Sequence, residues 1–381
     1  NLFRYVGYNG DDTTVFYGLE NLNTELVTDI SNMFNCCKNA TSIDVRSFNT
    51  KNVTNMESLF YNCQNVTSLY IDNLYTNNVI SMAHMFGKCQ NIVNLDLNSF
   101  NTSNVTNMLS MFYGCSSLTD IDVSEFDTSN VINISYMFRE CRNIASLDIS
   151  NFNTSNVTSM TNMFAYCDNL INLNVRNIDT NRVTTMSEMF LGCSKLTNLD
   201  ISNFNTSNVT KMYGMFSYCN NITELNLSNL DTSKVTNMFS MFNGCVGLTN
   251  LNVDNFVTNN VKNMSFMFNG CSNLINIDLS NFDTSNVTDM SYMFNYSSNL
   301  MSIKLDNFDT SKVTNMECMF RNCRKVTDLN INKFNTNNVS NWTNMFSSVS
   351  SNIKIKTNSD TATWLKEKFT NITDANIELV S

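Results

Sequence analysis

The 381-residue chain has no proline, only 10 glycines and one histidine, and its apolar runs are short. None of these runs approaches the roughly 18 consecutive apolar residues that a membrane-spanning helix needs. No secretory signal is visible and the chain starts at Asn1, so we expect a mature or excised segment. Acidic residues number 33 against 23 lysines and arginines, which gives a net charge of −10 without a basic cluster. This balance argues against nucleic acid or an anionic membrane as the main partner.

The chain does contain a long repeat. Residues 152–170, FNTSNVTSMTNMFAYCDNL, are matched 26 residues earlier by FDTSNVINISYMFRECRNI at 126–144. A fixed period of this length marks a solenoid, in which each unit buries its apolar face against its neighbours. The phenylalanine in this motif anchors each of thirteen units: Phe34, Phe60, Phe86, Phe112, Phe138, Phe164, Phe190, Phe216, Phe242, Phe268, Phe294, Phe320 and Phe346.

Alignment of the units on this anchor reveals which positions the fold constrains. Valine stands seven residues before the anchor and threonine ten before it in all 13 units, and cysteine stands three after it in 11. The positions −7, −4, −1, 0 and +3 lie on one face of a helix with 3.6 residues per turn, and threonine at −6 suits its N-cap. In the unit anchored at Phe164 the residues expected to be structural are Thr154, Val157, Met160, Met163, Phe164 and Cys167.

The other half of each unit has a different period. In LINLNVRNI at 170–178, Leu173 and Val175 alternate with polar residues, as in a strand with one buried face. We therefore predict an α/β solenoid of about 13 coils, each with one short strand and one short helix. The invariant threonine is polar yet never exchanged, so its hydroxyl is expected to be buried and bonded to backbone at the strand-to-helix corner.

The ends depart from the repeat, and we expect them to be caps. The prediction is an N-terminal cap at 1–18, one solenoid domain at 19–352 and a C-terminal cap at 353–381. In the first cap, YVGY and TTVFYG are expected to be short extended segments. In the second, we expect a strand at IKIK, a helix at SDTATWLKEKFT with Ser359 as its N-cap, and a strand at NIELV. Three apolar residues of that helix are expected to cover the last layer: Trp364, Leu365 and Phe369.

The pattern L-x-x-L-x-L resembles the leucine-rich repeats. The fuller unit, LDISNFNTSNVTSMTNMFAYCDNL at 147–170, is similar to the 26-residue repeat of BspA-like bacterial surface proteins, which is also abundant in mycoplasma surface lipoproteins. This resemblance covers about residues 19–352 and implies a right-handed solenoid, at the cell surface or secreted, that is used in adhesion or host interaction. The family brings no catalytic motif, and its members differ in what they bind.

The cysteines raise the question of a metal site or of disulfide bonds. Zinc ligands cluster as C-x2-4-C pairs, whereas these cysteines recur once per coil and give way to Ser297 and Val349. A disulfide needs Cβ atoms ~3.5–4.5 Å apart, but equivalent atoms in a parallel ladder lie ~4.8 Å apart. The lone His84 stands at a variable position, and we find no G-x-S-x-G, P-loop or HExxH motif. We predict packing thiols, no metal, no cofactor and no enzyme activity.

Two surfaces are candidates for binding. An outward column of the strand carries Asp96, Asp122, Asp148 and Asp200, for which a solvated acidic ladder is favoured over a weak calcium or basic-ligand site. The outward side of the predicted helices varies most between units and carries large residues. Exposed aromatic patches mark interfaces, although these rings could instead lie flat over gaps between coils. The residues predicted to bind a protein partner are Tyr166, Tyr213, Tyr218, Phe239, Phe266 and Tyr292.

The sequence thus predicts a non-enzymatic bacterial surface protein that mediates adhesion or partner binding. One alternative is a structural or shielding surface layer without a specific ligand. Another is a binder of ice or a similar repetitive surface, which needs a flat row of exposed threonines. Burial of the threonine column from Thr24 to Thr336 would count against this last alternative.

Overall fold

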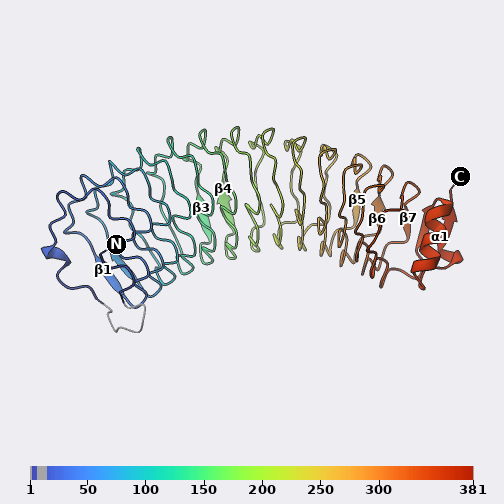
Figure 1. Cartoon of the computed structure of the whole chain (residues 1–381), viewed down its shortest axis with the longest axis horizontal. Coiled ribbons are helices and arrows are strands. Elements are labelled where there is room, and N and C mark those ends of the chain that lie inside the picture. Colours follow the sequence, from blue (N-terminus) through green and yellow to red (C-terminus); the bar gives the residue numbers. More distant parts are fainter. Residues whose placement is uncertain (1, 7–14, 381) are drawn as a thin grey trace. The chain divides into compact units, whose positions relative to one another are not determined.

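The computed structural model describes residues 2–6 and 15–380. The chain forms two compact units, one made of Asn1–Val183 with Gly192–Leu196 and the other of Thr184–Leu191 with Thr197–Ser381. Within each unit, the coils follow one another in chain order (Figure 1). The architecture is a right-handed β-solenoid of about 13 turns, and its parallel strands pair with the equivalent strands one repeat later.

The strands are short and parallel. In the first unit β1 (Ser42–Asp44) pairs with β2 (Ser68–Tyr70), and β3 (Ser146–Asp148) pairs with β4 (Asn172–Asn174). The second unit holds one five-stranded parallel sheet in the order β5-β6-β7-β8-β9. Its strands are β5 (Asn276–Asp278), β6 (Ser302–Lys304), β7 (Asp328–Asn330), β8 (Lys354–Thr357) and β9 (Ile377–Leu379). We call this side of each coil the strand segment.

The predicted period of two is confirmed in the strand segments. Leu147 of β3 lies opposite Leu173 of β4, and both neighbouring positions in β3 are exposed. Val175, two residues further on, is also buried. Each coil therefore sends alternate side chains of its strand segment into the core.

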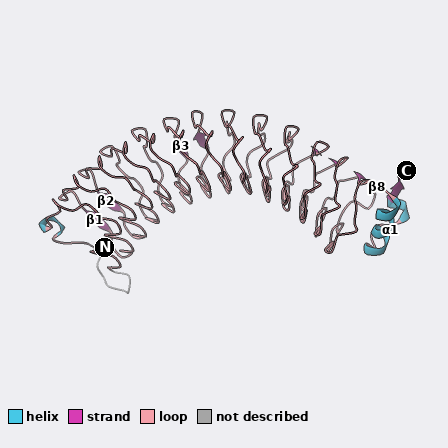
Figure 2. Cartoon of the chain, turned by 45° about the horizontal axis from the view of Figure 1, so that its top comes forward, coloured by secondary structure: helices cyan, strands magenta, loops and turns pink. Residues whose placement is uncertain are grey.

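The prediction of a short helix in each coil was wrong. Among the described residues, helix is confined to α1 (Ser359–Lys368) and two single 3-10 turns, η1 (Leu19–Asn21) and η2 (Asp374–Asn376), as Figure 2 makes plain. The eight residues from four before to three after each anchor form successive turns, and we call them the turn segment. The residues two before and two after the anchor have positive φ in all 13 coils, for example 56° at Asn162 and 60° at Tyr166. A right-handed helix cannot contain such left-handed residues.

Hydrogen bonding explains why the turn segment is not helical. In a helix each N–H donates to the carbonyl four residues earlier, but here alternate N–H groups donate to the next coil. The N–H of Phe138 donates to the Met163 carbonyl at 3.0 Å, and that of Tyr136 donates to the Thr161 carbonyl at 2.9 Å. The intervening N–H groups close local turns, as Cys167 does onto Phe164 at 3.2 Å. Threonine at −6 therefore caps no helix.

The turn segments nevertheless bury the columns that the repeat holds constant. Val157, Met160, Met163, Phe164 and Cys167 are all buried. The anchor rings stack from coil to coil, with centroids 5.8 Å apart for Phe190 and Phe216 and 5.7 Å apart for Phe216 and Phe242. A helix face and a series of turns can thus present the same side chains inward.

The threonine column lies at the corner between the two segments. Thr154 is only 1% exposed, and its hydroxyl donates to the Asp179 carbonyl of the next coil at 2.7 Å. Thr232 both donates to the Val257 carbonyl at 2.9 Å and accepts from the Val257 N–H at 2.8 Å. The threonines are buried in every coil but the last, where Thr336 is half-buried. They therefore form no exposed row of the kind that an ice binder needs.

All 13 cysteines are free and buried. In most coils the thiol donates to the carbonyl of the preceding coil's anchor, as Cys167 does to Phe138 at 3.1 Å. Ser297 occupies the same column, and its hydroxyl donates to the Phe268 carbonyl at 2.6 Å. Burial raises the pKa of the Cys115, Cys167 and Cys245 thiols to about 12. Each cysteine of this column is thus a core residue with one hydrogen bond to donate.

The N-terminal residues imitate part of a turn segment. The N–H of Phe3 donates to the Met33 carbonyl at 3.0 Å, and that of Tyr5 donates to the Asn35 carbonyl at 2.9 Å. The Phe3 ring stacks on Phe34 at 5.4 Å. These residues satisfy the acceptors of the first coil. The extended segment expected at YVGY is wrong for Tyr5 and Val6, which form part of a turn, and its other two residues lie outside the described part of the chain. The first two residues of TTVFYG also lie outside it, and Val15 forms a parallel bridge to Ser42.

The C-terminal elements follow the predicted order of strand, helix and strand, as β8, α1 and β9. The N-cap of α1 is Asn358 rather than Ser359, because the Asn358 side chain accepts the N–H of Thr361 at 2.9 Å. Leu365 and Phe369 are buried, and the Phe369 ring meets the last anchor, Phe346, at 5.2 Å. Trp364 is half-buried against Trp342. The division into caps at 1–18 and 353–381 and a solenoid at 19–352 stays a prediction.

Candidate binding surface on the turn face

The outward surface of the turn segments, which we call the turn face, is where the coils differ most. Its side chains stand at positions −3, −2, +1 and +2 relative to the anchor. Their backbone is held by the hydrogen bonds between coils, so each position accepts a variety of residues without a change of fold. This surface corresponds to the predicted helix side, although it is made of turns.

A contiguous group of rings lies on the turn face of the second unit. Phe239 meets Phe266 edge-on at 5.7 Å, and Phe266 stacks on Tyr292 at 4.5 Å with 8° between the ring planes. We call these three residues the aromatic ladder. Phe239 is 37% exposed and the other two are half-buried. The ladder therefore offers aromatic surface on three consecutive coils.

The ladder ends at a carboxylate. The Tyr292 hydroxyl donates to Glu317 Oε1 at 2.6 Å, and Asn341 Nδ2 donates to Glu317 Oε2 at 3.0 Å. The hydrogen bond to Glu317 raises the pKa of Tyr292, because it favours the protonated phenol. The last ring of the ladder is thus fixed in orientation and does not ionise near neutral pH.

Other predicted rings lie flat on neighbouring coils. A Cβ atom at Gly244 would come within 2.5 Å of the Tyr218 ring, and one at Gly192 within 2.9 Å of the Tyr166 ring. Each tyrosine therefore covers a glycine of the next coil, as the alternative interpretation of these residues expected. Tyr218 still exposes 49% of its surface.

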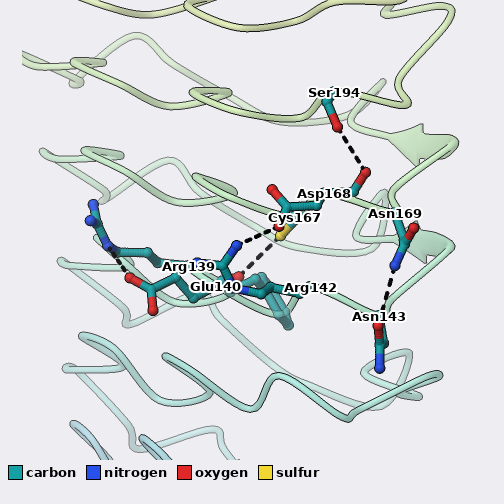
Figure 3. A network of polar contacts seen from close by, with 9 residues as sticks. Arg139, Glu140, Arg142, Asn143, Cys167, Asp168, Asn169 and Ser194 are labelled. Carbon is teal, nitrogen blue, oxygen red and sulfur yellow. Dashed lines mark hydrogen bonds and ion pairs between the residues drawn. The ribbon is translucent and has the colours of Figure 1, made fainter.

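Arginines enclose Tyr166 in the first unit. The Arg139 guanidinium lies 5.1 Å from the Tyr166 ring centroid and that of Arg142 lies 5.8 Å from it. Figure 3 shows that Arg139 also pairs with Glu140 and that Arg142 pairs with Asp168, the latter at 2.5 Å. These charges compensate one another, so the network is a balanced surface feature rather than a strong field.

The structure therefore brings together three of the six residues predicted to bind a partner. Phe239, Phe266 and Tyr292 are in direct ring contact, whereas no ring contact within the described residues joins Tyr213 or Tyr218 to them. Tyr213 is half-buried. Tyr166 belongs to the first unit and has its own cationic neighbours.

The acidic column of the strand segment faces outward, but its carboxylates bond to their own chain. Asp148 Oδ1 accepts the N–H of Ser150 at 2.9 Å, and Asp122 Oδ1 accepts that of Ser124 at 2.9 Å. The same two-residue turn occurs at Asp96 and Asp200. Hydrogen bonds from these serines lower the pKa of Asp122 and Asp148. Each aspartate closes the turn after its strand, in the way that Asx turns do.

Neighbouring residues of this column also relieve repulsion between carboxylates. Asn174 Nδ2 donates to Asp148 Oδ2 at 3.1 Å, and Lys304 Nζ donates to Asp278 Oδ2 at 2.7 Å. The Lys304 bond holds the pKa of Asp278 at about 2. Among the described residues, no group of three or more histidine, cysteine or acidic side chains is arranged to hold a metal ion. Nor does that part of the chain contain a helix long and apolar enough to span a bilayer.

The sequence analysis did not predict the cations that lie between aromatic rings of neighbouring coils. Lys88 Nζ lies 5.8 Å from the Tyr61 ring and 5.5 Å from the Tyr113 ring, which stand one coil before and one coil after it. The sequence did contain a signal for such contacts, because a large residue in one coil stands beside a small or flexible residue at the matching position of the next coil. Such pairs are visible only after the units are aligned by coil.

The family model described as "Mycoplasma protein of unknown function, DUF285" matches residues 10–95, 80–175, 168–276 and 245–364. No curated protein matches the chain. Among solved structures, the pneumococcal vaccine antigen PcpA is similar at 12% identity and a TM-score of 0.37, over 93% of this chain and 85% of PcpA. The functional domain of InlJ from Listeria monocytogenes is similar at 13% and 0.26, over 90% and 68%. TLR13, in a complex with ssRNA13, is similar at 12% and 0.27; 93% of this chain spans 52% of TLR13.

Proposed function

The chain belongs to the DUF285 family of Mycoplasma proteins, and from this premise we propose a non-enzymatic protein of the bacterial surface that binds a protein partner through its turn face. The finer proposal is adhesion, with a host or matrix protein as the partner. The aromatic ladder of Phe239, Phe266 and Tyr292 is the observation that carries the proposal.

Three features of the two faces support this choice. The buried columns are nearly identical in all coils, so they cannot distinguish one partner from another. The turn face varies from coil to coil and offers partly exposed aromatic rings, which are the side chains that dominate binding hot spots. The outward surface of the strand segments, which we call the strand face, carries by contrast short polar side chains whose acceptors already close turns, as at Asp122 and Asp148.

The repeat itself supplies matched substitutions for a test. Serine stands at the Phe239 position in Ser187, and at the Phe266 position in Ser240, where φ is 55°. The double variant Phe239→Ser with Phe266→Ser therefore removes two rings of the ladder with residues that the fold already accepts. Its thermal transition is expected to stay close to that of the wild type, because both rings are partly exposed.

The experiment presents the wild type and the variants to solubilised host-cell surface proteins and to purified matrix components. We expect the wild type to retain a specific partner and the double variant to lose at least about tenfold in affinity, as removal of two hot-spot rings does. The matched control replaces Asp96, Asp122, Asp148 and Asp200 with asparagine, which other coils carry in the same column.

Binding that survives the double variant and disappears in the asparagine control would move the site to the strand face. An unrelated solenoid protein serves as the negative control. If the wild type retains no partner that this control does not also retain, the structural or shielding role replaces the binding role. A variant that loses its thermal transition would be uninformative alone, so Tyr292→Ser serves as a second, independent removal of one ring.

A further inference from the structure

The two ends of the solenoid are closed in different ways. At the first coil, residues Phe3 and Tyr5 donate to the carbonyls of Met33 and Asn35. In the rest of the solenoid, each turn segment except the last donates alternate N–H groups to the carbonyls of the coil that follows. The last turn segment, 342–349, has no fourteenth coil to receive its donors, because α1 and the chain after it take that place.

The donors of the last turn segment therefore lack backbone acceptors. One coil earlier, the N–H groups of Cys318, Phe320 and Asn322 donate to carbonyls of the last coil at 2.9–3.0 Å. The equivalent donors of the last coil are the N–H groups of Trp342, Asn344, Phe346 and Ser348. Among the residues that the structure describes, none accepts a hydrogen bond from these four N–H groups.

Three of these four residues border a pocket of 450 Å³ at the end of the second unit. Its lining includes Trp342, Asn344 and Ser348 from the turn segment. The opposite side is formed by residues at and after the end of α1, among them Lys368 and Thr370. The Lys368 ammonium lies over the Trp342 ring at 5.1 Å.

The pocket has the chemistry of an anion site. Asn344 and Ser348 have φ of 57° and 58°, and a residue of positive φ beside one of negative φ is the backbone conformation of anion-binding nests. The N–H groups of Met345 and Ser347 close local turns, so those of Trp342, Asn344 and Ser348 remain to meet an anion. The lining contains one charged side chain, the cationic Lys368, and no acidic one. In interior coils each equivalent N–H group donates to a separate carbonyl oxygen, as Cys318 does to Thr343, and an oxyanion is a stronger acceptor for the same donors.

We propose that this end pocket binds an oxyanion, such as a carboxylate, sulfate or phosphate group, between the backbone N–H groups of 342–348 and the Lys368 ammonium. The anion could be a free ion or the acidic group of a larger molecule. The proposal concerns the C-terminal end of the second unit and is independent of the aromatic ladder.

Tryptophan fluorescence offers a direct test. The chain has only two tryptophans, so Trp364→Phe leaves Trp342, which lines the pocket, as the sole reporter. Sulfate, phosphate and acetate are titrated separately against chloride at constant ionic strength, together with a glutamate-rich peptide. We expect a saturable change with at least one oxyanion and none with chloride. Tighter binding of the peptide than of acetate would identify a macromolecular acid as the source, and tighter binding of sulfate or phosphate a free ion or ester.

Two charge variants locate the site. Lys368→Gln is expected to weaken binding by about tenfold or more, because it removes a charge-assisted hydrogen bond. Lys366→Gln is the matched control on the same helix, since its ammonium pairs with Asp374 at 3.1 Å and does not line the pocket. Equal weakening by both variants would indicate a general charge effect and overturn the site.

Backbone amides give the decisive readout. In amide NMR spectra the N–H signals of Trp342, Asn344 and Ser348 should shift on titration with the bound anion, while those of Cys318 and Asn322, which already donate to the last coil, should not. A fluorescence change without these amide shifts would overturn the proposal, as would the absence of any response to all four probes.

Discussion

The strand segment and the turn segment of each coil obey one rule with different backbones. In the strand segment, extended residues such as Leu147 pair in register with residues 26 positions later, here Leu173. In the turn segment, left-handed residues two before and two after the anchor also leave donors directed to the next coil, as from Phe138 to Met163. The comparison teaches that stacking requires only donors and acceptors directed along the stack, and either conformation supplies them. What differs is the side chains, with thiols and rings on one side and carboxylates on the other.

This difference predicts that the protein is far more sensitive to alkali than to acid. Burial raises the pKa of the Cys115, Cys167 and Cys245 thiols from 9.0 to about 12, whereas unfolded thiols ionise near their ordinary pKa. Stability is therefore complete below pH 9 and falls as the pH rises from there towards 12, by about 1.4 kcal/mol per thiol per pH unit. We expect cooperative unfolding in this window, measured by circular dichroism at increasing pH.

Thiol titration supplies the control for the alkaline prediction. Denatured protein without reductant should show close to all 13 thiols, and native protein at neutral pH only a few. On the acid side, the pKa of Asp278 is lowered to about 2, so its contribution is present above 3.8 and is lost as the pH falls towards 2. A protein that unfolds in mild acid while staying folded at high pH would contradict the contrast between the two segments.

The second prediction compares single core truncations in the two segments. Phe216→Ala removes a ring that stacks on both neighbouring anchors and should cost about 3–5 kcal/mol. Leu227→Ala, in a strand segment of the same unit, should cost about 2–4 kcal/mol because the residue lost is smaller. Chemical denaturation of both variants measures the two values. A larger cost for Leu227 would place the main core beneath the strands.

The third prediction concerns the corner that joins the segments. Thr232→Val keeps the side-chain volume but removes the hydroxyl that donates to and accepts from Val257. A buried carbonyl and a buried N–H then lose their partner, so we expect a loss of about 1–3 kcal/mol in the free energy of unfolding. Thr232→Ser retains the hydroxyl and separates the hydrogen bonds from packing. Equal stability of the valine variant and the wild type would mean that water replaces the hydroxyl.

The smallest effect is expected on the strand face. Asp148→Ala removes the acceptor for the Ser150 N–H and for Asn174, but the site is exposed and water can substitute, so the loss should stay below about 1 kcal/mol. Asp148→Asn keeps the turn and should be nearly neutral. If the free energy of unfolding fell as much as in Phe216→Ala, the acidic column would be as important for stability as the buried core.

The sequence predicted the repeat, the strand segments and the buried columns because side-chain period survives any backbone that faces the core the same way. It did not predict the turn segments, since −7, −4, −1, 0 and +3 fit a helix face equally well. The residue types at the two positions of positive φ did argue against a helix. Five glycines occupy these two positions, namely Gly114, Gly192, Gly214, Gly244 and Gly270, and glycine is favoured where φ is positive and disfavoured inside a helix.

The candidate sites were predictable to different degrees. The aromatic residues of the turn face were visible as large side chains at variable positions, but sequence could not separate the ring contacts of Phe239, Phe266 and Tyr292 from the covering roles of Tyr166 and Tyr218. That distinction depends on the direction of each side chain relative to the next coil. The end pocket was beyond prediction, because backbone donors leave no trace in residue identity.

The matching of hydrogen-bond donors and acceptors between neighbouring coils has a consequence for the gene. Every coil presents the same donors to its successor and the same acceptors to its predecessor, so any coil can follow any other. Unequal recombination that deletes or inserts 26 codons would join two coils whose hydrogen bonds still match. Lineages could therefore vary the number of coils, and with it the set of turn-face residues, while the two terminal segments stay unchanged.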